Sequence, residues 1–473
     1  MKGFKKQVSQ VCVFLMAMSA IVVDAADWTL EKGVSLSEVF TDNEDLDERN
    51  QNSAFISSVT PFLLLKGEGA RLKANINTQL EFTTSKDGHI NPRLGASADA
   101  ELLEQQVFLE TSANITQNTV DAFRSSGIDS LNNTNNSTTT YNFQLSPYTV
   151  NHFENFADLR TRYTFNHQTN SSDDVSGSHS QRINANLQSG SDFQRFDWRL
   201  AANYKDTNSS GDASSSDLGS LDATLGYKIT PLLRLSFTAG EEWNDYTSSR
   251  NSNDGSLWQG GLHWTPSTRT SLDVGYGERY FGSWPTFSFT HRSRHSILSA
   301  SYSKELTDSA TQLSELRTYQ TVNSQGVPIN PITGAPLPVV SELVNIQEGL
   351  FIDEKLGLSW SLIGVRSSLT FSGSRSRQLY ETSRPDEITT NYSMNFNRRL
   401  SPLLDFSTGY YLRSQSSDNG IDADTQTVSF TLMRQVADGG TLAFSYLYSL
   451  RDSDLLFDDY TENRLQFAYT FQF

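Results

Sequence analysis

The residue types that most often carry out chemistry are scattered along this chain and form no known motif. There is no Gly-x-Ser-x-Gly turn, no His-Glu-x-x-His helix, no cysteine pair and no glycine-rich phosphate loop. The acidic run at 42–48 lacks the glycine and the spacing of a calcium-binding loop. The sequence therefore predicts no catalytic residue, no cofactor and no metal site, and we expect the protein not to be an enzyme. We expect the acidic run to be solvated, or to bridge divalent ions loosely at a lipopolysaccharide surface.

One set of basic residues could bind a ligand. Its six members stand next to apolar residues in alternating segments, and they are Arg71, Lys73, Arg160, Arg162, Arg195 and Arg199. If the apolar neighbours face lipid, these six side chains face a lumen and could line a channel for anionic cargo. Alternatively, they pair with Asp197, Glu81 or Glu101 on nearby strands and only stabilise the wall, because an unpaired charge in a confined lumen carries a desolvation cost.

The elements that would position these side chains are β-strands. Apolar residues alternate with polar ones over segments such as 72–82, 196–204, 356–362, 428–432 and 442–448. Since strand side chains alternate between faces, each segment has one apolar and one polar face. Repeated segments of this kind, about ten residues long, predict a single large antiparallel transmembrane β-barrel. A soluble sandwich or propeller is the alternative, but its exposed strand faces should be charged, whereas here they favour Ser, Thr, Asn and Gln.

The C-terminal segment shows the pattern most clearly. Its alternating apolar residues are Leu465, Phe467, Tyr469, Phe471 and Phe473. An aromatic last residue that closes an amphipathic strand resembles the signal that bacterial outer-membrane barrels present to the β-barrel assembly machinery. We therefore expect that machinery, outer-membrane lipids and lipopolysaccharide as partners.

The connections between strands alternate in length. Tight turns at 67–69, 189–192, 363–364 and 438–440, and Ser/Thr-Pro turns at 146–147, 230–231, 265–266 and 401–402, are separated by longer polar stretches. Short periplasmic turns and longer extracellular loops are typical of outer-membrane barrels. Counting strands predicts 22 between Trp28 and Phe473, with 18 or 20 as alternatives. Residues 305–349 are rich in Pro and Gly, so we expect a long extracellular or lumen-folding loop there rather than wall.

The N-terminus and the composition indicate the compartment and exclude other classes. Lys2, Lys5 and Lys6 precede an apolar run at 11–23, which predicts a signal peptide over 1–25 and a barrel over 26–473; a retained anchor is the weaker alternative. Strand-like sequence follows at once, which argues against a plugged receptor of the siderophore type.

The composition excludes other classes of protein. One cysteine excludes a disulfide scaffold. A content of 11% aromatic and 19% charged residues disfavours disorder, and a net charge of −17 disfavours nucleic-acid binding.

Four N-terminal segments carry a resemblance to a known family. They are Val34-Ser35-Leu36-Ser37-Glu38, Thr41-Asp42-Asn43, Val59-Thr60-Pro61 and Gly67-Glu68-Gly69-Ala70-Arg71. The sequence resembles outer-membrane β-barrel proteins associated with the PEP-CTERM/exosortase sorting system, which usually accompany exopolysaccharide gene clusters in Gram-negative bacteria. The resemblance implies an outer-membrane setting and transfers no functional residue.

These observations together predict a porin-like conduit or accessory in exopolysaccharide or surface-polymer export, with exopolysaccharide or its export machinery as a partner. Transport would be by diffusion through a wide polar lumen gated by residues 305–349. The alternative is a structural or adhesive surface protein whose lumen is occluded.

Overall fold

The computed structural model describes residues 26–85, 90–127, 131–132, 134–172, 175–210, 215–315, 321–322, 328–329, 349–436 and 439–473. The predicted signal peptide at 1–25 lies outside the described residues. Within the described part of the chain, no α-helix is long and apolar enough to cross a bilayer.

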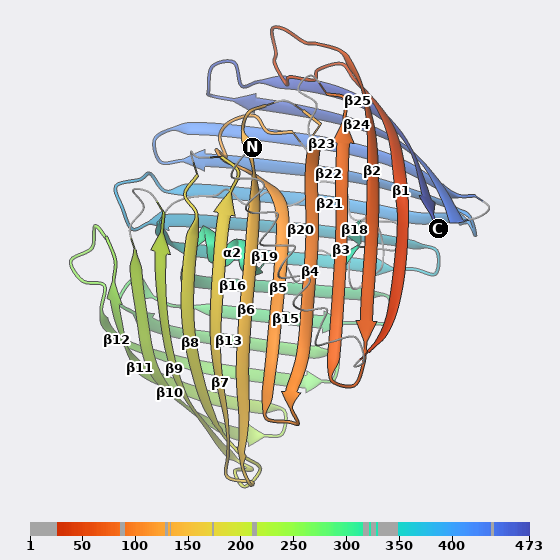
Figure 1. Cartoon of the computed structure of the whole chain (residues 1–473). Coiled ribbons are helices and arrows are strands. Elements are labelled where there is room, and N and C mark those ends of the chain that lie inside the picture. The colour runs from red at the N-terminus through yellow and green to blue at the C-terminus, as the bar shows by residue number, and fades with distance from the viewer. Residues whose placement is uncertain are drawn as a thin grey trace.

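The described chain is almost entirely β-strand (Figure 1). The first half of the wall contains β1 (Asp27–Thr41), β2 (Ala54–Glu68), β3 (Leu72–Thr83), β4 (Ile90–Leu103), β5 (Val107–Thr119), β6 (Ser137–Phe153), β7 (Ala157–Asn170), β8 (Ser178–Ser189), β9 (Phe196–Ser209), β10 (Ser216–Thr230), β11 (Leu233–Asp245), β12 (Gly255–Ser267) and β13 (Thr270–Arg279). The second half contains β14 (Gly282–Ser283), β15 (Thr286–Arg292), β16 (Ser296–Asp308), β19 (Leu350–Ile363), β20 (Ser367–Tyr380), β21 (Glu387–Ser401), β22 (Leu404–Ser417), β23 (Ile421–Gln435), β24 (Gly440–Ser453) and β25 (Tyr460–Gln472). One short helix, α2 (Ser309–Glu315), and a separate strand pair, β17 (Thr321–Val322) with β18 (Pro328–Ile329), follow β16.

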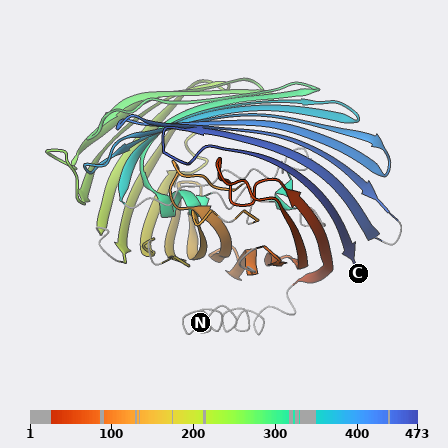
Figure 2. The ribbon, with the colours of Figure 1, turned by 90° about the horizontal axis from the view of Figure 1, so that it is seen from above.

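The strands form one closed antiparallel barrel. Each wall strand pairs with its neighbour in the chain, and β25 pairs back onto β1, with Gly33 opposite Gln472 and Thr41 opposite Arg464. The short β14 and the following β15 both pair with β13 in one continuous register, so they count as a single wall strand. The wall therefore has 22 strands, and the predicted fold class and strand number are confirmed. Figure 2 shows the ring of strands from above.

The connections alternate as predicted. Short turns follow β2, β4, β6, β8, β10, β12, β15, β19, β21 and β23. Most of the opposite ends are joined by longer loops such as 120–136 and 246–254, although the connections at 280–281 and 418–420 are short. Both Asp27 and Gln472 lie on the short-turn side, which is the periplasmic side in this architecture. Two expected turns were misplaced: Thr265 and Pro266 still belong to the end of β12, and Ser146 and Pro147 lie inside β6. The wall tolerates Pro147 there because the β6–β7 ladder skips that position and resumes in the same register at Tyr148.

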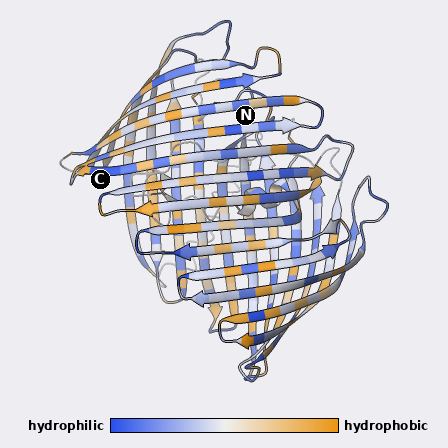
Figure 3. Cartoon of the chain, turned by 180° about the vertical axis from the view of Figure 1, so that it is seen from behind, coloured by the Kyte–Doolittle hydropathy of each residue, from blue (hydrophilic) through white to orange (hydrophobic). Residues whose placement is uncertain are grey.

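The outer face of the barrel is apolar and uncovered. Residues that share this face by cross-strand pairing remain accessible, for example Leu225 at 65%, Phe196 at 64% and Phe467 at 50%. Figure 3 shows the alternation of apolar and polar residues along the strands. A soluble sandwich would pack these side chains between two sheets, so that alternative is wrong. The outward apolar side chains of the alternating strands are therefore suited to contact with the hydrocarbon of a bilayer.

The last strand contributes both to this face and to closure. Pairing with β1 and β24 places Leu465, Phe467, Tyr469 and Phe471 outward, and the Phe473 backbone N–H donates to the Lys32 carbonyl at 2.9 Å. The residues predicted to form the assembly signal therefore lie together on the outside of the closing strand.

Candidate functional site: the lumen and the loop that crosses it

Four of the six basic candidates point into the lumen. Cross-strand pairing places Lys73, Arg160, Arg162 and Arg199 on the face opposite to the apolar one. Arg71 and Arg195 instead lie in short turns, just before β3 and β9. The structure brings only Arg160 and Arg162 together, since they lie two residues apart on β7 and both stack on the Tyr148 ring, at 4.3 and 4.5 Å from its centroid.

These basic side chains have acidic neighbours on nearby strands. Arg162 donates to both carboxylate oxygens of Glu110, and Arg160 lies 3.8 Å from the same group. Arg199 approaches Asp222 at 3.4 Å, and Arg71 approaches Glu104 at 3.1 Å. Lys73 stands in register between Glu68 and Asp99.

The expected acidic partners have other roles. Asp197 pairs with Arg234, Glu81 lies 4.0 Å from Arg93, and Glu101 accepts a hydrogen bond from the backbone of Gln105. The sequence indicated that these arginines and lysines would meet acidic residues, but it did not identify the partners. The partners lie on adjacent strands, as Asp222 does for Arg199, or two strands away, as Glu110 does for Arg162. The charges on this part of the lumen largely neutralise one another.

The other half of the lumen wall is mostly uncharged at mid-height, with Lys355 and Arg413 as exceptions by register. By the register of β16 to β25, hydroxyl and amide side chains occupy these positions, including Ser301, Ser359, Ser372, Ser393, Asn395, Thr431 and Ser445. Many bond to each other across strands, as Ser361 with Thr370 at 3.2 Å and Thr431 with Ser445 at 3.0 Å. This half offers mostly uncharged donors and acceptors.

One segment that crosses the lumen is the loop at 120–136, here called the crossing loop. It leaves the wall between β5 and β6 and reaches the β24–β25 hairpin, with β1 to β4 between the two places. Asn136 holds its two ends together: its amide nitrogen donates to the carbonyls of Asp121 and Arg124 at 2.8 and 3.1 Å, and its side-chain oxygen accepts from the Asp121 N–H. The loop thus crosses the lumen as a defined structure over its described residues.

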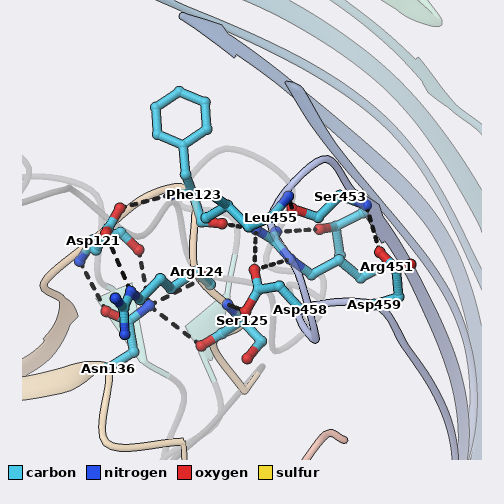
Figure 4. A network of polar contacts seen from close by, with 11 residues as sticks. Asp121, Phe123, Arg124, Ser125, Asn136, Arg451, Ser453, Leu455, Asp458 and Asp459 are labelled. Carbon is cyan, nitrogen blue, oxygen red and sulfur yellow. Dashed lines mark hydrogen bonds and ion pairs between the residues drawn. The ribbon is translucent and has the colours of Figure 1, made fainter. Parts of the chain in front are cut away.

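Arg451 on β24 is the first anchor of the crossing loop (Figure 4). Its side chain is only 4% exposed and donates to the Phe123 carbonyl at 2.6 Å, to Asp458 at 3.2 Å and to Thr425 at 3.1 Å. Asp458 in turn accepts from the Ser125 N–H at 2.9 Å. One buried ion pair on the far hairpin therefore holds two backbone groups of the loop.

A second anchor lies on β25. Asn132 donates to Glu462 at 3.1 Å and accepts from Arg464 at 2.5 Å, and both charged side chains are almost fully buried. Beside it, Leu131 packs against Val39 and Ile56 of the first two strands. The crossing loop is thus fixed by polar contacts to the last hairpin and by an apolar contact to β1 and β2.

A second inward segment begins at the end of β16. Lys205 on β9 bonds to Asp308 and, at 2.8 Å, to Thr311, while Gln312 of α2 donates to Asp353 at 2.9 Å. In Figure 2 the teal helix α2 lies inside the ring of strands. The expected boundary of the insertion needs correction, because 305–308 continue β16 as wall and leave only 309–349 as the insertion. Most of 316–348 lies outside the described residues.

A third contact spans the extracellular loops. The Arg250 guanidinium donates to both carboxylate oxygens of Glu381, at 2.8 and 2.9 Å, so the loop 246–254 is tied to the β20–β21 connection. Beside it, the Tyr246 and Tyr280 hydroxyls lie 3.1 Å apart, and burial raises the pKa of Tyr280 to about 12.

The described residues form no candidate metal-binding group. No group of three His, Cys, Asp or Glu among them could hold a metal ion. His152 and His263 each pair with a single aspartate, Asp158 and Asp273, at 2.5 Å. In the acidic run, Asp47 accepts from the backbone N–H groups of Arg49 and Asn50, which lowers the pKa of that carboxyl. The run therefore shapes its own loop.

Sequence reasoning missed the crossing loop, which looked like an ordinary polar extracellular connection. Two features could have indicated it. Ala122, Phe123 and Leu131 are apolar residues in an otherwise polar stretch, and all three are buried. Arg451 and Arg464 also occupy lumen-facing positions in strands whose other lumen-facing residues are mostly uncharged.

Comparisons with known proteins agree with this architecture. No protein-family model and no curated protein matches the sequence. Among solved structures, the chain is similar to the FrpB iron transporter (F3-3 variant) of Neisseria meningitidis, with 9% identity, a TM-score of 0.54, and coverage of 94% of this chain and 81% of that one. It is also similar to the siderophore receptor PirA of Acinetobacter baumannii (10%, 0.52, 94% and 81%) and to the ferric-catecholate import receptor Fiu of E. coli (9%, 0.50, 93% and 82%). At these identities the likeness concerns the fold, that of a large outer-membrane barrel.

Proposed function

We propose that this protein is an outer-membrane conduit, or an accessory of one, for export of an exopolysaccharide or related surface polymer, with the crossing loop as its gate. The setting would be a Gram-negative cell with PEP-CTERM sorting. The observation that carries the proposal is a loop held across the lumen by two compact anchors on one hairpin, Arg451 with Asp458 and Arg464 with Glu462.

Two further features support a conduit for a sugar polymer. A barrel of 22 strands encloses an interior that must be filled or gated. The lumen wall combines paired charges with a wide, mostly uncharged surface rich in Ser, Thr and Asn. Such a surface can exchange hydrogen bonds with sugar hydroxyls, and it presents little excess charge that would trap a passing chain.

Planar-bilayer conductance of the purified protein tests the gate. Residues 122–134 would be replaced by a short Gly/Ser linker, and the wild type would be compared with this variant and with Arg124→Met, a change at an exposed loop side chain. We expect a clear rise in conductance for the shortened loop only. A deletion strain should lose exopolysaccharide secretion and regain it with the wild-type gene. Conductance equal in all three proteins, or normal secretion without the gene, contradicts the proposal.

The second candidate is a structural or adhesive surface protein with an occluded lumen. It is favoured by the number of segments that fold over or into the extracellular half: the crossing loop, α2 with Lys205, and the loop 246–254 tied to Glu381. No current from either the wild type or the shortened-loop variant, together with loss of cell adhesion in the deletion strain, would support this candidate.

A further inference from the structure

The lipid-facing side of the barrel carries two arginines near its short-turn end. Arg398 lies on β21 opposite Phe406, and Arg434 lies on β23 between Leu404 and Leu442, so both belong by register to the outer apolar face. Both side chains are exposed. Among the described residues, neither has an ion pair or a hydrogen bond to a protein group. These two cations therefore stand on a largely apolar surface, which by register also carries Lys32 on β1 and Arg375 on β20.

An open cavity of about 530 Å³ lies beside Arg434. Its walls include Leu404, Leu432, Leu442, Phe444 and Phe467, all on the outward face of β22 to β25. Arg434 is the one charged residue that lines it. The cavity is thus an apolar groove with a guanidinium at the end nearest the short turns.

The height of this site in the membrane follows from the register. Leu442, next to Arg434, pairs with Tyr469, and the outward aromatic residues Phe471 and Phe473 continue toward the end of the chain. Aromatic residues on the outer face mark the membrane–water interfaces of such barrels. Arg434 therefore lies at the depth of the lipid headgroups of the periplasmic leaflet, while Leu432 and Phe444 lie deeper.

Arginine at this depth suits one ligand group. The planar guanidinium binds phosphate through two parallel hydrogen bonds, and arginine near an interface costs little when its charge is satisfied there. Arg398 and Arg434 are separated by one strand, β22, and are offset by two positions along it, so they lie about 12 Å apart across the surface. Both side chains are long enough to reach a single headgroup placed over Leu404.

We infer that this groove is a binding site for a phospholipid of the periplasmic leaflet, with its phosphate on Arg434 and Arg398 and an acyl chain along Leu432, Phe444 and Phe467. Because the groove is outside the lumen, this inference is independent of the proposed transport function. A phospholipid held at the seam beside β25 would act as an annular ligand of the barrel.

Lipid retention tests this site. The full-length barrel would be purified from outer membranes in a mild detergent, and the bound lipid per barrel would be measured by native mass spectrometry. The variants are Arg398→Gln with Arg434→Gln, and the control is Arg294→Gln, a change in a distant short turn. We expect the double variant to retain at least several-fold less phospholipid than the wild type and the control. Barrels that stay compact on an unheated denaturing gel confirm that all the variants are folded.

Three outcomes would overturn the site. They are equal phospholipid retention in the double variant, retention of lipopolysaccharide alone, and displacement of the bound lipid by inorganic phosphate at moderate concentration. The last would mean that the arginines bind a free anion and that the groove has no part in binding.

Discussion

Replacing Arg451 with methionine should release the crossing loop. The guanidinium is 4% exposed and is the donor to the Phe123 carbonyl and to Asp458. Methionine preserves much of the apolar stem but leaves the Asp458 carboxylate without its cation and the Phe123 carbonyl without its donor. The side chain of Asp458 is itself only 13% exposed, so the variant would leave a poorly solvated carboxylate without its counter-charge.

The size of the effect follows from this burial. Removing one member of a buried ion pair typically costs about 3–5 kcal/mol. Since 1.4 kcal/mol corresponds to a factor of ten, a loss of about 3 kcal/mol would raise the ratio of released to anchored loop by roughly 100-fold. The apolar contacts of Phe123 and Leu131 remain, so we expect release of the loop rather than unfolding of the barrel.

Two assays would measure this release. A reporter cysteine at Ser126, in a protein with Cys12 replaced by serine, should react with maleimide much faster in the Arg451→Met variant. Single-channel recordings should show more frequent open events. Arg124→Met is the matched control on the same loop, because its side chain is 70% exposed and its ion pair with Asp121 is worth about 1 kcal/mol or less. Unchanged labelling and unchanged conductance in a folded Arg451→Met barrel would refute the gate as described.

Four further predictions address other contacts. Asn132→Ala should loosen the second anchor, at a cost of about 1–3 kcal/mol. The rate of maleimide labelling at the Ser126 reporter should then at least double, and labelling at the wild-type rate would contradict this prediction. Arg250→Met should expose the loop 246–254 to added protease on intact cells, while Arg292→Met should not. Equal cleavage of the two variants would show that the ion pair between Arg250 and Glu381 does not hold this loop. Tyr280 should titrate near pH 12 by tyrosinate absorbance. Because its folded pKa lies above that of free tyrosine, about 10, its contribution to stability is complete below pH 10 and declines up to pH 12; titration at pH 10 would argue against its burial. Phe473→Ser should slow assembly, seen as accumulation of the unfolded band on unheated gels, whereas Gln472→Ser should not, and equal assembly of the two would remove the role given to the last residue.

The wall of this protein is largely predictable from its sequence because strand geometry acts locally. Strand side chains alternate between the two faces, so the apolar and polar faces of segments such as 442–448 and 465–473 can be assigned from the local sequence alone. The strand count and the alternation of turns and loops follow from the same rule. The turn predicted at Ser146 and Pro147 was misplaced because proline usually ends a strand, whereas here the ladder with β7 only skips two positions.

The contents of the lumen were not predictable in the same way. Whether Arg162 meets Glu110 or another acid depends on the registers in which β5 and β7 each pair with β6, which the period of the sequence does not encode. The crossing loop is a stronger case, since Ser125 and Asp458 are more than 300 positions apart in the chain. Such contacts are set by how the barrel closes, and no local pattern at 120–136 identifies its partner.

The position of the anchors constrains the order in which the molecule can be completed. The crossing loop belongs to the first third of the polypeptide, but the groups that hold it, Arg451, Asp458, Glu462 and Arg464, are among the last to be synthesised. Those same residues flank the seam, where β25 contributes nine paired positions to β1 against the fifteen that β1 shares with β2. Sealing of the cylinder and docking of the loop should therefore be late, coupled events, so an intermediate stalled before its final hairpin would be both unsealed along one edge and unobstructed inside.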